Sequence, residues 1–130
     1  MTTRLFAKGP APCLLMPTDF QQPARRAFAY GVKLATAFGF RLEILHVIKT
    51  VADAAGAAPD SRTLHSLKTA ALLELGRLAR VAQEAGVRAE PRLQYGVPDT
   101  CIADLASRLH PRMIVMGTEG RTGWDRLRLG

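Results

Sequence analysis

The stretch Cys13-Leu-Leu-Met-Pro-Thr-Asp-Phe20 decides the fold of this 130-residue chain. Its first four residues form a continuous apolar run, and such a run is typical of a strand that is buried on both faces. Strands of this kind belong to parallel sheets whose two faces are covered by helices. Pro17 ends the run, and Thr18 and Asp19 place polar groups directly after the carboxyl end of the strand.

The segments that follow alternate between helical and extended patterns. Apolar residues recur at spacings of three and four in the helical segments, and short apolar or alternating runs separate these segments. We therefore expect an α/β fold, a Rossmann-like doubly wound parallel sheet, in one domain over residues 1–130. The expected strands span residues 13–16, 41–48, 87–95 and 113–116, and the expected helices span about 21–39, 61–85 and 98–109.

Single residues refine this expectation. Gly39 is placed to end the first helix as its C-cap. Pro91 has no N–H to donate, so the third strand is predicted to be an edge strand or to carry a bulge. Residues 51–60 show no apolar periodicity and are expected to form a flexible connection. The core stripe of the second helix is expected to consist of Leu64, Leu67, Ala71, Leu75, Leu78 and Ala82.

Composition excludes several classes of protein. The net charge is +7, but the charges are scattered and are not interleaved with aromatic residues, so nucleic-acid binding is not favoured. No apolar run reaches the ~18 residues of a membrane span, and the N-terminus lacks a signal peptide, so we expect a cytoplasmic protein. The isolated Cys13 and Cys101 are expected to be reduced thiols.

A glycine-rich loop follows the last expected strand. Gly117-Thr-Glu-Gly-Arg-Thr-Gly123 comes directly after the apolar run 113–116, and Arg121, Arg126 and Arg128 add positive charge. Glycines let backbone N–H groups approach an anion, so this arrangement indicates a phosphate site. If the first and fourth strands are neighbours, Asp19 and the loop share one crevice at the carboxyl edge of the sheet.

Four segments together resemble the universal stress protein family, and they span nearly the whole chain. They are Leu15-Met-Pro-Thr-Asp-Phe20, Leu45-His-Val47, Gly96-Val-Pro98 and Ile114-Val-Met-Gly-Thr-Glu-Gly-Arg-Thr-Gly123. The most specific feature is the glycine spacing G-x-x-G-x(9)-G that ends at Gly130. The resemblance implies an adenine nucleotide alpha hydrolase-like fold with strand order 3-2-1-4. It also implies a regulatory stress-response protein that binds ATP or a related adenine nucleotide, with or without Mg²⁺, and hydrolyses it slowly or not at all.

The same resemblance assigns roles to residues. Asp19 would contact the adenine or the ribose, with Pro17 and Thr18 shaping the wall of the pocket. For Asp19, a role as N-cap of the following helix is an equal alternative, and the two roles are compatible. The remaining expected contacts are Val47 on the adenine face, Met116 in the same pocket, Gly117, Gly120 and Gly130 at the phosphates, and Arg121 at the phosphate oxygens.

The end of the sequence departs from the family pattern. The Ser or Thr expected after Gly130 is absent, as are the last helix and the last strand, which in this family pairs two subunits into a homodimer. We therefore expect the sequence to be a fragment of a longer chain.

Two other functions stay open. Glu119, inside the glycine loop, and the missing tail favour a family member that binds no nucleotide and acts as an interaction module for a regulatory protein partner. A nucleotide-dependent transferase on a similar fold is the other alternative. His46, His65 and His110 lack ligand spacing, so we predict no catalytic residue and no protein metal site, and at most a weak ATPase activity.

Overall fold

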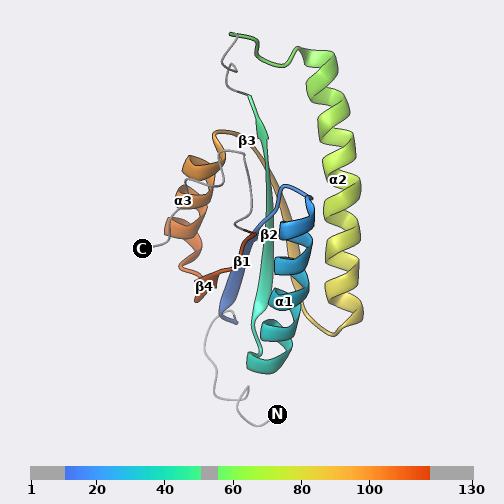
Figure 1. Ribbon diagram of the computed structural model, residues 1–130. Coiled ribbons are helices and arrows are strands. Elements are labelled where there is room, and N and C mark those ends of the chain that lie inside the picture. The colour runs from blue at the N-terminus through green and yellow to red at the C-terminus, as the bar shows by residue number, and fades with distance from the viewer. Residues whose placement is uncertain (1–10, 51–55, 118–130) are drawn as a thin grey trace.

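The computed structural model describes residues 11–50 and 56–117, which form a parallel sheet covered by helices on both faces (Figure 1). The strand order is β3-β2-β1-β4, so the predicted fold class and strand order are confirmed. No helix within these residues is both long and apolar enough to cross a membrane. The elements are β1 (Cys13–Pro17), α1 (Gln22–Phe38), β2 (Arg41–Lys49), α2 (Ser61–Glu84), β3 (Ala89–Gly96), α3 (Pro98–Leu109) and β4 (Met113–Ile114).

β1 lies between β2 and β4 and is buried over its whole length. Its side chains alternate between the two faces of the sheet, as the strand period requires. Leu14 and Met16 face α1 and α2, whereas Leu15 faces α3. The apolar run that begins at Cys13 is continuous because both faces of this strand are covered.

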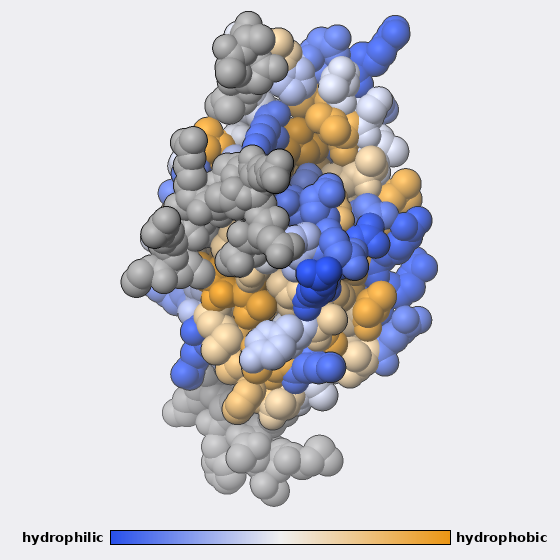
Figure 2. Space-filling model, viewed as in Figure 1, coloured by the Kyte–Doolittle hydropathy of each residue, from blue (hydrophilic) through white to orange (hydrophobic). Residues whose placement is uncertain are grey.

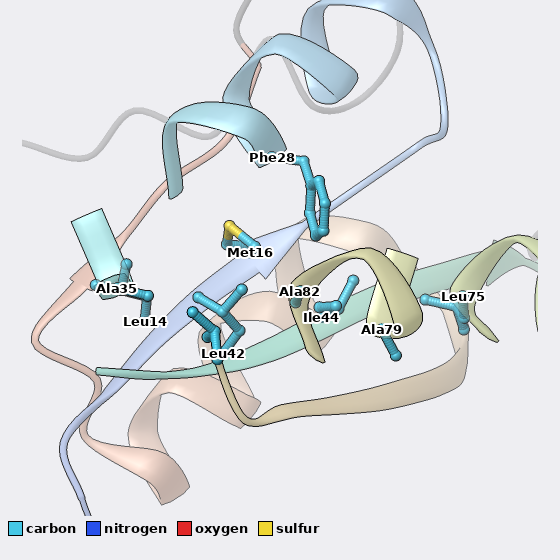
Figure 3. Close-up of a cluster of buried hydrophobic side chains, with 10 residues drawn as sticks. Leu14, Met16, Phe28, Ala35, Leu42, Ile44, Leu75, Ala79 and Ala82 are labelled. Atoms are coloured by element: carbon cyan, nitrogen blue, oxygen red, sulfur yellow. The ribbon is translucent and has the colours of Figure 1, made fainter. Parts of the chain in front are cut away.

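The larger core lies between the sheet and the helix pair α1 and α2 (Figure 3). Burying this apolar surface is the main favourable contribution to folding. Figure 2 shows hydrophilic residues along the outer side of α2, away from this core. The buried members of the core are Leu14, Met16, Phe28, Ala35, Leu42, Ile44, Leu75, Ala79, Ala82 and Val87.

The core stripe of α2 differs from the predicted one in its first turns, where neither Leu64 nor Leu67 joins the core, and at Ala79. Ala79 is buried although the sequence pattern did not single it out, and Leu67 is 43% exposed although the pattern placed it in the core. The cause is the length of α2, because its first turns extend past the part of the sheet that could cover them (Figure 1). Helical periodicity identifies a face of the helix, and it does not show how far along the helix that face is covered.

The ends of the elements follow local signals in the sequence. Gly39 adopts the left-handed conformation at φ 73° and caps α1, as predicted. Asp60 is the N-cap of α2, and its carboxylate accepts a hydrogen bond from the Thr63 N–H at 2.7 Å. Residues 56–60 of the predicted connection form no helix or strand, and residues 51–55 lie outside the described part of the chain.

Both outer strands are present as predicted, although their bounds differ: β3 begins at Ala89 and not at residue 87. β3 is an edge strand, which confirms the prediction from Pro91. The assigned β4 is shorter than the predicted 113–116, although the Val115 N–H still donates to the Leu15 carbonyl at 3.0 Å. Val115 contacts the larger core and Met116 the smaller one, so the alternation of a strand continues beyond its assigned end.

A buried carboxylate lies near the amino end of the sheet. Glu43 is 2% exposed and forms ion pairs with Arg41 on its own strand and Arg92 on β3. A buried charge is tolerated when it is paired and hydrogen-bonded. The two guanidinium groups therefore account for the presence of an acidic residue at a buried position of β2.

The packing of α1 on β1 gives a first prediction. A Cβ at Gly31 would overlap the sulfur of Met16, which is itself buried, so Gly31→Ala should lower the free energy of unfolding by about 1 kcal/mol or more despite the better helix propensity of alanine. Gly76→Ala in α2 is the matched control, because a Cβ there meets no atom within 4 Å. The control should raise the free energy of unfolding by about 0.5–1 kcal/mol. Urea denaturation measures both, and equal stabilisation by the two substitutions would contradict the packing argument.

Candidate ligand site at the carboxyl edge of the sheet

The order in which successive strands are added to the sheet reverses at β1. From β1 the chain proceeds to β2 and β3, and it then crosses back to place β4 on the other side of β1. Open α/β sheets bind ligands outside the carboxyl ends of the strands at such a reversal. The segments that leave β1 and β4 at this edge are residues 18–21 and 115–117, and both contain predicted site residues.

The segment after β1 is a tight turn held by its own side chains. The Asp19 carboxylate accepts a hydrogen bond from the Gln21 N–H at 2.9 Å, and the Thr18 hydroxyl accepts one from the Phe20 N–H at 3.0 Å. The N-cap of α1 is Gln21, and no side chain caps this helix, so the alternative of Asp19 as N-cap is wrong. Only one Asp19 carboxylate oxygen is used within the turn, which leaves the other available for a ligand.

Phe20 takes part in this turn, although the sequence analysis assigned it no role. Its backbone has a positive φ of 66°, which is rare for a bulky residue and requires support from its surroundings. The Phe20 ring stacks on the His46 ring with centroids 4.2 Å apart, and its carbonyl accepts a hydrogen bond from Arg25 Nε at 3.0 Å. Arg25 on α1 and His46 on β2 therefore both hold the turn in place.

His46 connects the ends of β1 and β2. Its Nδ1 lies 2.7 Å from the Thr18 carbonyl oxygen, and a carbonyl only accepts, so Nδ1 carries the proton. The Thr18 N–H in turn donates to the Leu45 carbonyl at 2.8 Å. Burial lowers the pKa of His46, because it disfavours the charged ring, and the hydrogen bond to Thr18 and the charge of Asp19 only partly oppose this.

The predicted apolar residues of the site lie on the α3 face of the sheet. Val47 is buried and belongs to the smaller core, and Met116 packs against the same cluster from the end of β4. Pro17 is the last residue of β1 and is buried as well. Thr18 is buried, and its hydroxyl accepts the hydrogen bond from the Phe20 N–H. Its side chain therefore stabilises the turn beneath the surface of the site.

Gly117 lies directly against the first turn of α1. A Cβ at this position would come within 2.5 Å of the Pro23 carbonyl carbon and within 2.7 Å of the Ala24 nitrogen. These are backbone atoms and cannot rotate away, so only glycine fits this close approach. The contact brings the end of β4 to the start of α1, where the positive end of the helix dipole lies.

The structure thus brings part of the predicted site together. Asp19 and Gly117 both lie at the start of α1, and Val47 and Met116 belong to one apolar cluster on the α3 face of the sheet. Gly120, Arg121 and Gly130 lie outside the described residues. Within residues 11–50 and 56–117, no three His, Cys, Asp or Glu side chains are grouped so as to hold a metal ion.

Comparison with known proteins gives a consistent result. The sequence profile of the universal stress protein family matches residues 14–130 of the chain. The universal stress protein MJ0531 of Methanocaldococcus jannaschii is 29% identical over 119 residues, which make up 90% of this chain and 70% of that protein. A solved structure of a universal stress family protein from Burkholderia pseudomallei has a TM-score of 0.74 at 23% identity, covering 90% of this chain and 87% of that one.

Two further similar structures were solved with an adenine nucleotide. A universal stress protein in complex with cAMP has a TM-score of 0.65 at 18% identity, covering 85% of this chain and 79% of that one. The universal stress protein from Archaeoglobus fulgidus in complex with dAMP has a TM-score of 0.59 at 17% identity, covering 81% and 78%. Likeness at these identities establishes a shared fold.

The buried His46 predicts a pH dependence of stability. Because its pKa is lower in the folded state than the ordinary value of 6.5, the unfolded chain binds the proton first as the pH falls. The free energy of unfolding should therefore decrease as the pH is lowered through 6.5. Once the pH is below the folded-state pKa, both states carry the proton and His46 causes no further decrease. Urea denaturation at about pH 7.5 and about pH 5.5 measures the change.

His46→Asn is the companion variant, because an amide can donate to the Thr18 carbonyl and does not titrate. It should be less stable at the higher pH, since the stacking on Phe20 is lost, but it should lose less stability on acidification than the parent. An identical loss in both proteins would contradict the assignment of the pH dependence to His46.

The close approach of Gly117 gives another prediction. Gly117→Ala should lower the free energy of unfolding by about 1–3 kcal/mol, because the backbone of α1 must shift to admit a methyl group. Chemical denaturation tests this directly. A variant as stable as the parent would contradict this prediction, because it would show that β4 and α1 can move apart without lowering the free energy of unfolding.

Proposed function

The chain belongs to the universal stress protein family, and on this basis and on the geometry of the carboxyl edge we propose that it binds ATP or a related adenine nucleotide. The single observation that carries the proposal is Gly117, which lies so close to the first turn of α1 that no side chain fits. A backbone without side chains beside a helix N-terminus is suited to approach by a phosphate group. The nucleotides in the two related structures support the choice of adenine.

The base and the sugar have a suitable environment in the described residues. The half-buried Met116, backed by the buried Val47, offers apolar surface on the α3 face at this edge, where an adenine ring could pack. Asp19 has one carboxylate oxygen engaged with the Gln21 N–H, and the other can accept a hydrogen bond from a ribose hydroxyl or from the adenine amine. Because the engaged oxygen fixes the turn, the second oxygen is held in a defined position.

The phosphate part of the proposal extends beyond the described residues. We assign Gly120 and Gly130 to the phosphates through their backbone N–H groups and Arg121 to the phosphate oxygens. The first turn of α1 carries no acidic residue, which favours the approach of an anion to this end of the helix. A Mg²⁺ ion would enter with the phosphates, since the described residues offer no dedicated group of ligands for it.

We propose a regulatory role in the stress response, with slow or no hydrolysis. Fast hydrolysis needs a base or a water-positioning group beside the terminal phosphate. His46, the histidine at this edge, uses Nδ1 to hold the Thr18 carbonyl and faces the α1 side of the sheet. Nucleotide occupancy would instead shift the conformation or the choice of partner. The proposal includes one domain over residues 1–130, a cytoplasmic location and pairing into a homodimer.

The proposal predicts the effect of a conservative change at Asp19. Asp19→Asn keeps an oxygen for the Gln21 N–H, so the turn is retained, but it removes the charged acceptor. The affinity for Mg·ATP should fall by about tenfold, which corresponds to ~1.4 kcal/mol and suits a hydrogen bond to a charged group. Calorimetric titration measures the affinity, and thermal unfolding confirms that the variant is folded.

Asp60→Asn is the matched control, because Asp60 also accepts a hydrogen bond from a backbone N–H but lies at the start of α2. It should leave the affinity unchanged. Absence of ATP binding by the folded parent protein at millimolar concentrations, or equal losses in the two variants, would overturn the proposal.

A further inference from the structure

A cavity lies on the face of the sheet opposite Val47 and Met116, between α1 and α2. Its volume is about 260 Å³, and it extends from the turn after β1 to the middle turns of α2. Val47 and Met116 contact α3, so this cavity is separated by the sheet from the surface to which adenine was assigned. Its size is somewhat below that of ordinary ligand pockets, so only a small ligand would fit.

The walls of the cavity are apolar and partly aromatic. Phe20 and Phe28 contribute rings from the turn and from α1, and Leu78 and Val81 contribute aliphatic side chains from α2. Figure 3 shows Phe28 extending from α1 toward the turn of α2 that carries Ala79 and Ala82. Val81 is 52% exposed, so part of this apolar wall faces solvent. A flat apolar molecule would remove this surface from water.

The rim of the cavity carries a net positive charge. Arg25 and Arg77 lie on its two sides, and Glu74 is the acidic member of the lining. Glu74 forms an ion pair with Arg77 at 2.6 Å, which compensates one of the two positive charges. Arg25 uses Nε to bind the Phe20 carbonyl at 3.0 Å, and this hydrogen bond fixes the plane of its guanidinium. Its other N–H groups remain for a second acceptor.

We propose that this cavity binds a small aromatic monocarboxylate. The aromatic walls suit a flat apolar body, and the single uncompensated charge suits a monoanion. A guanidinium of fixed orientation matches the two oxygens of a carboxylate. A phosphate ester carries about −1.5 to −2 charges and would leave part of its charge uncompensated at this rim.

Titration of the whole protein with indole-3-acetate tests the proposal, with the neutral indole-3-acetamide as the probe that lacks the charge. Protein-detected NMR should show saturable shifts for residues of α1 and α2 that line the cavity. Indole-3-acetate should bind about three- to fivefold more tightly than the amide, as expected for an ion pair near solvent. No saturable binding at millimolar concentrations, or equal binding of the two probes, would overturn the proposal.

Two pairs of variants locate the site. Val81→Phe should fill the cavity and abolish binding, whereas Leu73→Phe, at another exposed position on α2, should not. Arg25→Gln should remove the preference for the charged probe, whereas Arg26→Gln, at the neighbouring exposed position on α1, should retain it. Val81 and Arg25 are exposed, so the variants are expected to fold. Binding that survives Val81→Phe would place the probe elsewhere and refute the assignment.

Discussion

The burial of β1 on both faces is the constraint on which the rest of the structure depends. A strand of five residues with every side chain buried requires a strand on each side and helices above and below. α1 and α2 meet this requirement on the face of Leu14 and Met16, and α3 meets it on the face of Leu15. The reversal of the chain at β1 follows, because β4 must cover the side that β2 leaves open.

The same arrangement produces the candidate site. Since β1 is central, its carboxyl end lies between β2, the next strand in the sequence, and β4, the last. The turn at Asp19 and the backbone at Gly117 are almost a hundred residues apart in sequence, yet both meet the start of α1. His46 holds this junction from β2, because its ring stacks on Phe20 and its Nδ1 donates to the Thr18 carbonyl. A ligand at this edge therefore meets a preformed surface with little freedom to rearrange.

The sequence predicted the layers of the fold well because each rests on a local signal. The buried run at residues 13–16, the glycine at position 39 and Pro91 each act through their own backbone or side chain. The sequence also singled out Asp19 and Gly117, and the structure places both at the start of α1, although the roles of all the predicted site residues remain predictions. It could not identify Phe20, whose positive φ depends on His46 and Arg25. Nor could it show that Leu67 lies beyond the cover of the sheet, because coverage depends on the relative lengths of distant elements.

Pro91 affects how readily another chain can pair with the free edge of β3. β3 forms one border of the sheet, and a bare border is a template on which another chain can extend the sheet. A strand that approached β3 would find no donor at Pro91 and would meet the charged Glu90 and Arg92 beside it. This border therefore discourages the edge-to-edge growth that leads to aggregation.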